Sequence, residues 1–287
     1  MRAYAECGDR PLGAPCLLVS SFGPAVIALT LFALYSAGAW VMLRSVSKPR
    51  LSPLAWGLTL GAIFVHSDAI VHMMRSLGPF SIGLLEAVSM LAWTLAVIAC
   101  FIGVEKQNRS IGAILLALAA FGAAVTGSGH AYAEETAPGW ELTAHILLSM
   151  GAAALFLAAA VAALVLVFLD RRLRAHRLAG LPRALPPLDA VEKVMFRLIG
   201  AGFVLLTLAL LTGFIFVTNL RTQHLEHKTI LSCIAWVLFG VLLIGRIRYG
   251  WRGRAAVRWT LSGFGVLILA YFGSKFVLEY LLGRHWG

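Results

Sequence analysis

The sequence has little charge and lacks the patterns that mark most soluble enzymes. Only 13% of its 287 residues are charged, whereas a soluble domain usually carries about 25%. It contains no Gly-x-x-x-x-Gly-Lys phosphate-binding loop and no nucleophile or metal-hydrolase motif. Its four cysteines form no Cys-x-x-Cys pair, which argues against thioredoxin-like redox chemistry. We therefore expect that the protein is not an enzyme in the sense of catalytic turnover.

What the sequence has instead is a series of long apolar runs. Hydrophobic residues make up 60% of the chain, and nearly uncharged runs of about 20 residues, each long enough to cross a bilayer as a helix, recur along it. The sequence predicts an all-α polytopic integral membrane protein with about eight transmembrane helices. The predicted spans are residues 23–43, 53–73, 80–103, 109–127, 141–169, 194–217, 229–245 and 257–281. Residues 1–22 are predicted to form an N-terminal tail, and residues 23–287 one transmembrane domain.

Basic residues gather in every second connection between the predicted spans. They are Arg44, Lys48, Arg50, Lys106, Arg109, Arg171, Arg172, Arg174, Arg177, Arg183, Lys193, Arg197, Arg246, Arg248, Arg252, Arg254 and Arg258. Cytoplasmic loops of membrane proteins carry such an excess of Lys and Arg, so this side is predicted to be cytoplasmic and both termini to lie outside. Nucleic-acid binding is not expected, because no basic segment interleaves with aromatic residues in a folded module.

Histidine is the residue type that points to a binding site. Under the predicted topology, most of the eight histidines lie at the outer face or one turn beneath it. These are His72, His130, His145, His224, His227 and His285. Imidazole is the usual nitrogen ligand for haem and for transition metals. The outer face is therefore where the sequence predicts chemistry.

Two of these histidines are the best placed. His145 is predicted one turn inside the fifth span, with Glu141 and Ser149 four residues away on the same helical face. A ligand histidine usually hydrogen-bonds such a partner through its second ring nitrogen. His227 begins the seventh span, and Trp236 lies nine residues, about 13 Å, further in. Each histidine also has a structural interpretation, as a hydrogen bond between helices or as a solvated residue at a helix end.

Further polar residues are predicted inside the membrane. Asp68 and His72 form an i,i+4 pair in the second span, which could relay protons, orient a ligand or tie two helices together. Glu86, Ser89 and Trp93 share one face of the third span. Polar side chains at this depth usually face other helices, so we expect hydrogen bonds between helices at that face.

A helix start is predicted at Pro186-Pro187-Leu188-Asp189, with Asp189 as the N-cap. Glu192, three residues on, would then complete a variant of the capping box.

Three segments carry a resemblance to a known family. The first runs from Phe80 to Trp93; the second comprises Leu188-Asp189, Gly200–Thr207 and Leu211–Gly213; the third comprises Lys228, Ala235-Trp236, Trp251–Arg254 and Tyr271–Gly273. In this order they make the sequence similar to the cytochrome c assembly superfamily, the haem-handling membrane proteins of the CcsA and CcmC type. The chain resembles most closely the branch of YpjD-like inner-membrane proteins.

The resemblance implies a haem site at the outer face. In the CcsA-type proteins two outer-face histidines bind haem beside a tryptophan-rich loop, and His145 matches the first of them by position. The tryptophan-rich loop corresponds to residues 219–228, which contain no tryptophan. The membrane histidine of the family falls on Ile244. The second outer histidine falls near Leu282, about one helical turn from His285.

The resulting hypothesis is a haem-binding or haem-handling protein of the bacterial inner membrane, of the cytochrome c assembly type. The candidate cofactor-binding residues are His145, His227, His285 and Trp236, with His145 and His227 as metal ligands and haem b as the cofactor. Expected partners are haem, the lipid bilayer and other cytochrome c maturation or membrane proteins. Two alternatives stay open. One is a haem-free scaffold or accessory subunit that keeps the fold without the site, and the other is a b-type electron carrier, for which only His66 lies deep enough.

Overall fold

The protein is a bundle of helices. The computed structural model describes residues 23–77, 84–126, 140–174, 186–216 and 226–270, and within these ranges all regular structure is helical. The α-helices of these ranges are α1 (Pro24–Arg44), α2 (Pro53–Leu77), α3 (Leu84–Val104), α4 (Arg109–Ala123), α5 (Trp140–Arg174), α6 (Leu188–Phe216), α7 (Glu226–Tyr249) and α8 (Gly253–Ile268). A short 3-10 turn, η2 (Lys106–Asn108), connects α3 to α4. The prediction of an all-α protein is confirmed, with one helix in the described residues for each predicted span.

Most of these helices are long enough to cross a bilayer. Within the described ranges, six have the necessary length and hydropathy, namely α1, α2, α3, α5, α6 and α7. The α4 helix has 15 residues, which corresponds to about 22 Å, less than the ~30 Å hydrocarbon thickness of a bilayer. It is shorter than its predicted span and packs against α1 and α3. The chain is a multi-pass membrane protein in which α4 contributes mainly to the interior.

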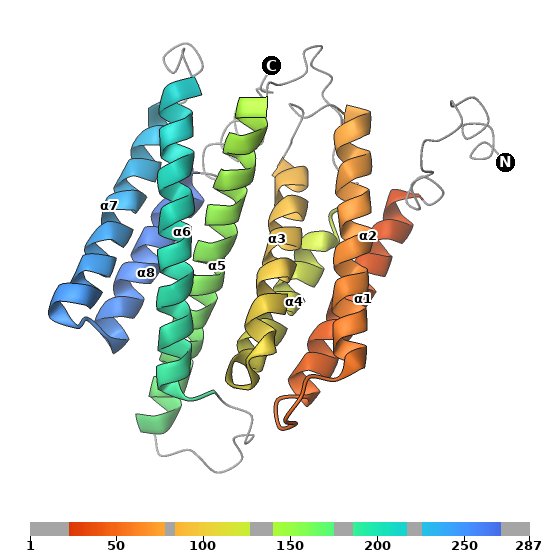
Figure 1. Ribbon diagram of the computed structural model, residues 1–287, viewed down its shortest axis with the longest axis horizontal. Helices are drawn as coiled ribbons and strands as arrows, with labels where there is room; N and C mark the ends of the chain where they lie inside the picture. Colours follow the sequence, from red (N-terminus) through yellow and green to blue (C-terminus); the bar gives the residue numbers. More distant parts are fainter. Residues whose placement is uncertain (1–22, 78–83, 127–139, 175–185, 217–225, 271–287) are drawn as a thin grey trace.

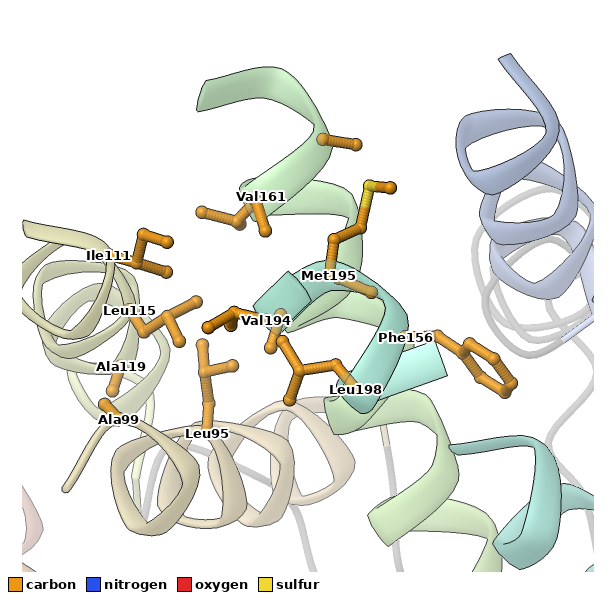
Figure 2. Close-up of a cluster of buried hydrophobic side chains, with 14 of the residues drawn as sticks. Leu95, Ala99, Ile111, Leu115, Ala119, Phe156, Val161, Val194, Met195 and Leu198 are labelled. Atoms are coloured by element: carbon orange, nitrogen blue, oxygen red, sulfur yellow. The ribbon is translucent and has the colours of Figure 1, made fainter. Parts of the chain in front are cut away.

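The helices form two groups that meet at α5. Figure 1 shows α1–α4 on one side of the molecule and α6–α8 on the other, with α5 between α3 and α6. Alanines Ala152, Ala158, Ala159 and Ala162 of α5 are buried, and small side chains allow neighbouring helices to approach closely. Apolar side chains that meet near this contact are Leu95, Ala99, Leu115, Val161, Val194 and Leu198 (Figure 2). A continuous apolar core therefore joins the two groups.

The basic connections meet at one end of the bundle. The α1, α3, α5 and α7 helices end, and α2, α4, α6 and α8 begin, at the lower end in Figure 1. At this end Arg197 of α6 pairs with Glu105 at 3.2 Å and so links the two groups of helices. Arg254 of α8 pairs with Asp170 of α5 at 3.3 Å. In the part of the chain that the structure describes, the predicted segregation of charge is present, and the side of the membrane that this end faces stays a prediction.

Arg109 holds the turn between α1 and α2. Its side chain is buried, and Nη1 donates to the backbone carbonyl oxygens of Ser45 at 2.7 Å and Lys48 at 2.8 Å. The last carbonyls of a helix have no partner within the helix, and they carry the negative end of its dipole. From the first turn of α4, the buried guanidinium therefore holds the backbone carbonyls of the turn that follows α1.

The turn between α7 and α8 needs glycine at two positions. Gly250 has a φ of 64° and Gly253 a φ of 57°, values that cost little only in a residue without a Cβ. Glu192 in the first turns of α6 binds Arg246 Nη1 at 2.7 Å and accepts a bond from the Gly253 backbone N–H at 3.4 Å. Through these bonds Glu192 holds the α7–α8 turn against α6.

The predicted N-cap of α6 is wrong. The helix begins at Leu188, and the Pro187 carbonyl already accepts bonds from residues 190 and 191, at 3.0 and 3.1 Å. Asp189 thus lies inside the first turn, where it pairs with Lys193 at 2.6 Å. Glu192 faces the α7–α8 turn, because a carboxylate gains more from charged donors than from a neutral backbone N–H.

Candidate functional site

His145 lies in the second turn of α5, at the end of the bundle opposite the basic connections. Its Nδ1 is 3.1 Å from Thr212 Oγ1 of α6, and its Nε2 is 3.5 Å from Ser149 Oγ, one turn further along α5. The ring is partly exposed. The expected same-face partner Ser149 is confirmed, whereas the side chain of Glu141 lies outside the described residues. Because 3.5 Å is at the limit of a hydrogen bond, one ring nitrogen is held firmly and the other loosely.

Gly213 lets the imidazole pack closely against α6. A Cβ built at this position would lie 3.2 Å from Cε1 of His145 and 3.7 Å from its Nδ1. Carbon atoms prefer separations of about 3.5–4.0 Å, so a side chain at residue 213 would displace the ring. The glycine therefore contributes to the position of His145 as directly as its hydrogen-bonding partners do.

Trp236 contacts α6 from another side. Its indole N–H donates to Thr207 Oγ1 at 2.9 Å, and its ring stacks on Phe203 with 5.4 Å between the ring centroids. Thr207 and Thr212 are five residues apart, which is about 140° around an α-helix. His145 and Trp236 therefore approach different sides of α6 in this structure.

The other candidate ligands are less well defined. His227 lies in the first turn of α7, but its side chain is outside the described residues, as is the whole of His285, so their roles stay predictions. Within the described ranges, no three His, Cys, Asp or Glu side chains converge as a metal site. Ile244, where the resemblance places a membrane histidine, is 58% exposed on α7. His145 is the one predicted ligand whose surroundings the structure defines.

A second polar cluster lies inside the α1–α4 group. His66 of α2 is completely buried, and its Nδ1 is 3.2 Å from the Tyr35 hydroxyl of α1. Its Nε2 is 3.0 Å from Ser89 Oγ of α3, which in turn is 2.8 Å from Thr126 Oγ1, beyond the end of α4. Because the His66 ring is completely buried and both of its nitrogens have hydroxyl partners within 3.2 Å, it is less suited than the partly exposed His145 to bind a haem iron. The cluster ties the elements of this group together.

Sequence reasoning found only part of this cluster. Ser89 belongs to the face of the third span at which interhelical hydrogen bonds are predicted, and that prediction is confirmed. Trp93 of the same face donates its indole N–H to Ser67 Oγ of α2 at 2.9 Å. Tyr35 and Thr126 were missed. A tyrosine within an apolar run is a usable signal, because a buried phenolic O–H usually requires a partner.

Glu86 provides a test of the structural interpretation of this face. It is buried in the first turn of α3. If its carboxyl serves as a hydrogen-bonding tie, Glu86→Gln should be mild, whereas Glu86→Leu should cost on the order of 0.6–2 kcal/mol in the free energy of unfolding. Unfolding in mixed detergent micelles measures both variants. Loss of function in Glu86→Gln at normal protein level would show instead that the ionised carboxylate is required.

Comparison with known proteins places this arrangement in a family. The sequence profile described as "Cytochrome C assembly protein" matches residues 81–282, which include His145, Thr212 and Trp236. "Inner membrane protein YpjD" of Escherichia coli K12 is 40% identical over 145 residues, 50% of this chain and 54% of the relative. The "Uncharacterized 28.8 kDa protein in nifR3-like 5'region" of Azospirillum brasilense is 38% identical over 149 residues, 51% of this chain and 55% of the relative.

A more distant relative carries a functional name. "Cytochrome c biogenesis protein CcsA" of Synechococcus elongatus is 30% identical over 107 residues, 37% of this chain and 33% of the relative. The chain thus spans about half the length of the first two relatives and a third of the last. No solved structure matches the chain. Because the family profile covers more than half of the sequence, the chain belongs to the cytochrome c assembly protein family.

Proposed function

We propose that this protein binds haem at the outer face of the bacterial inner membrane and handles it for cytochrome c assembly. The observation that carries the proposal is the position of His145, which lies at the end of the bundle away from the basic connections with Nε2 only loosely held. Its partners are proposed to be haem, the lipid bilayer and other cytochrome c maturation proteins. The protein is proposed to act by binding, without catalytic turnover.

The residues around His145 fit such a cofactor. Bound haem supplies an iron centre that takes nitrogen ligands at its axial positions. The His145 ring is partly exposed, and breaking the 3.5 Å contact between Nε2 and Ser149 costs little. His227 or His285 is proposed as the opposite ligand, and haem b as the haem type. Trp236 of α7 is proposed as a further residue in contact with the haem.

The test is an optical spectrum of the purified protein. A Soret band, in protein as purified or after reconstitution with haem, supports the proposal, and a pyridine haemochrome then identifies the haem type. Protein that carries no haem and takes up none on reconstitution would refute the proposal.

A haem-free scaffold is the second candidate. It is favoured by the fact that both ring nitrogens of His145 already have hydroxyl partners within the protein, as expected of a histidine that ties two helices together. The two candidates differ in a property that can be measured, because the scaffold predicts no Soret band under any loading condition.

The proposed orientation makes a separate prediction. Because the basic helix ends should face the cytoplasm, alkaline phosphatase fused after His285 should be active and the same enzyme fused after Ala179 inactive. Green fluorescent protein, which folds in the cytoplasm, is the matched control and should give the opposite pattern at the same two positions. The reverse result for both reporters would place His145 on the cytoplasmic side.

A further inference from the structure

Thr212 occupies a special position beside His145. Its Oγ1 lies 2.9 Å from the carbonyl oxygen of Leu208 and 3.0 Å from that of Ala209, in addition to the 3.1 Å contact with His145 Nδ1. A hydroxyl has one proton to donate and two lone pairs to accept with. Two carbonyls, which can only accept, compete for that proton. The hydroxyl therefore donates to its own helix and presents a lone pair to the imidazole.

The hydroxyl of Thr207, five residues earlier on α6, also lies between a backbone carbonyl and the ring nitrogen of a neighbouring helix. Its Oγ1 lies 2.7 Å from the Phe203 carbonyl oxygen and 2.9 Å from the Trp236 indole nitrogen. An indole N–H can only donate, so here the hydroxyl must accept from the ring and donate to the carbonyl. The geometry at Thr212 matches, with the imidazole of His145 in place of the indole.

We infer that Thr212 is a positioning residue that holds His145 in the tautomer with its proton on Nδ1 and so presents Nε2 as the iron-binding atom. In a neutral imidazole, protonation of one nitrogen leaves the lone pair on the other. Nε2 then accepts only the long bond from Ser149, which iron coordination displaces. Gly213 keeps the ring against α6 so that the Thr212 bond can form. This inference rests on the proposed haem function, and it adds which nitrogen binds and which residue selects it.

The tautomer can be measured without haem. In haem-free protein labelled with ¹³C and ¹⁵N in histidine, solid-state ring shifts distinguish the two neutral tautomers, and the signals missing from His145→Ala assign those of His145. Wild-type His145 should carry its proton on Nδ1, and Thr212→Ser should preserve this state. Thr212→Val should shift part of the population to the Nε2-protonated form. Thr207→Val is the matched control, because it removes an equivalent hydroxyl from the same helix, and His145 should not change.

The haem-loaded protein provides the second readout. A ligand histidine becomes more basic when the ring nitrogen that does not bind the metal donates a hydrogen bond. Loss of that bond typically weakens metal binding by 10–100-fold. Thr212→Val should therefore weaken haem binding by about 10-fold or more and raise the midpoint potential, because a less basic imidazole stabilises the ferric state less. Thr212→Ser, which keeps the hydroxyl, should restore both values.

The outcomes separate the inference from the proposed function. Wild-type His145 protonated on Nε2, or ring shifts that are the same in Thr212→Val, overturns the role of Thr212 even if haem binds. A fall in haem affinity in Thr212→Ser equal to that in Thr212→Val overturns it too, because Thr212→Ser keeps the hydroxyl and the effect would then be a loss of packing and not of the hydrogen bond. Absence of haem from wild-type protein overturns the proposed function, while the haem-free tautomer measurement still decides whether Thr212 orients the ring.

Discussion

Replacing His145 by alanine should remove most of the haem from the purified protein while leaving its helix content unchanged. The imidazole is the only proposed axial ligand whose surroundings are described, and it is partly exposed, so its removal creates no closed cavity in the core. Thr212 keeps its bonds to the α6 carbonyls when the ring is absent, and Ser149 loses only a contact of 3.5 Å, which is at the limit of a hydrogen bond. Haem per protein from the pyridine haemochrome and far-ultraviolet circular dichroism measure the two quantities.

Added imidazole and a second histidine variant make this result specific. Free imidazole should enter the vacated position and restore haem to His145→Ala. His72→Ala is the matched control: it removes a histidine from the same end of the bundle, on α2 in the other group of helices, and should retain haem. Full haem occupancy in His145→Ala, or an equal loss in His72→Ala, would contradict the assignment of His145.

The opposite axial ligand can be identified with the same measurement. His227 is favoured because it lies in the first turn of α7, and α7 packs beside α6. His285 is favoured by the resemblance to the family, with a shift of about one turn. His227→Ala and His285→Ala should therefore differ, one lowering haem occupancy strongly and the other having little effect.

The helices and their direction were predictable because each depends on a local property of the sequence. Apolar length defines the spans, and the basic residues at alternate connections define which helix ends lie together. The length of α4 was not predictable in the same way. Its apolar run continues to residue 127, but the helix ends at Ala123. Hydropathy does not distinguish contact with lipid from contact with other helices.

The partners of polar residues required the structure. Trp93 and Trp236 lie deep in their spans, where an indole N–H usually finds a hydrogen-bond partner, but the sequence could not identify Ser67 and Thr207 as their hydroxyl acceptors. A helical face can be predicted from spacing alone. The neighbouring helix that it meets depends on packing between segments far apart in the chain, and His145 with Thr212, 67 residues away, is the example at the candidate site.

Glu192 illustrates the same limit for a charged residue. Its spacing from Asp189 indicated a local capping role, but its partners are Arg246, 54 residues later, and the α7–α8 turn. Arg252 Nε lies 3.4 Å from the same carboxylate. The side chain is 13% exposed and that of Arg246 is 22% exposed. An ion pair shielded to this degree depends on both partners, because either one alone would keep a charge that is poorly solvated.

Removing this carboxylate should therefore destabilise the α6–α8 side of the protein. Glu192→Leu should lower the free energy of unfolding by about 2–4 kcal/mol, because Arg246 loses its charged acceptor and the α7–α8 turn loses its link to α6. Titration from mild detergent into sodium dodecyl sulfate, followed by tryptophan fluorescence, measures the change; Trp251 and Trp259 stack beside this turn. Asp189→Leu is the matched control, because it removes an exposed acid from the same end of α6, and the Asp189–Lys193 pair is solvated.

A double variant distinguishes an ion pair from simple loss of packing. If the cost of Glu192→Leu comes from the charge left on Arg246, then replacing Arg246 by leucine as well should recover part of the lost stability, because no unpaired charge remains at the contact. If the two losses merely add, the pair does not act as a unit, and the tie between α6 and the α7–α8 turn must come from the apolar contacts around it. If Glu192→Leu is as stable as the wild-type protein, Glu192 has no structural role at this turn.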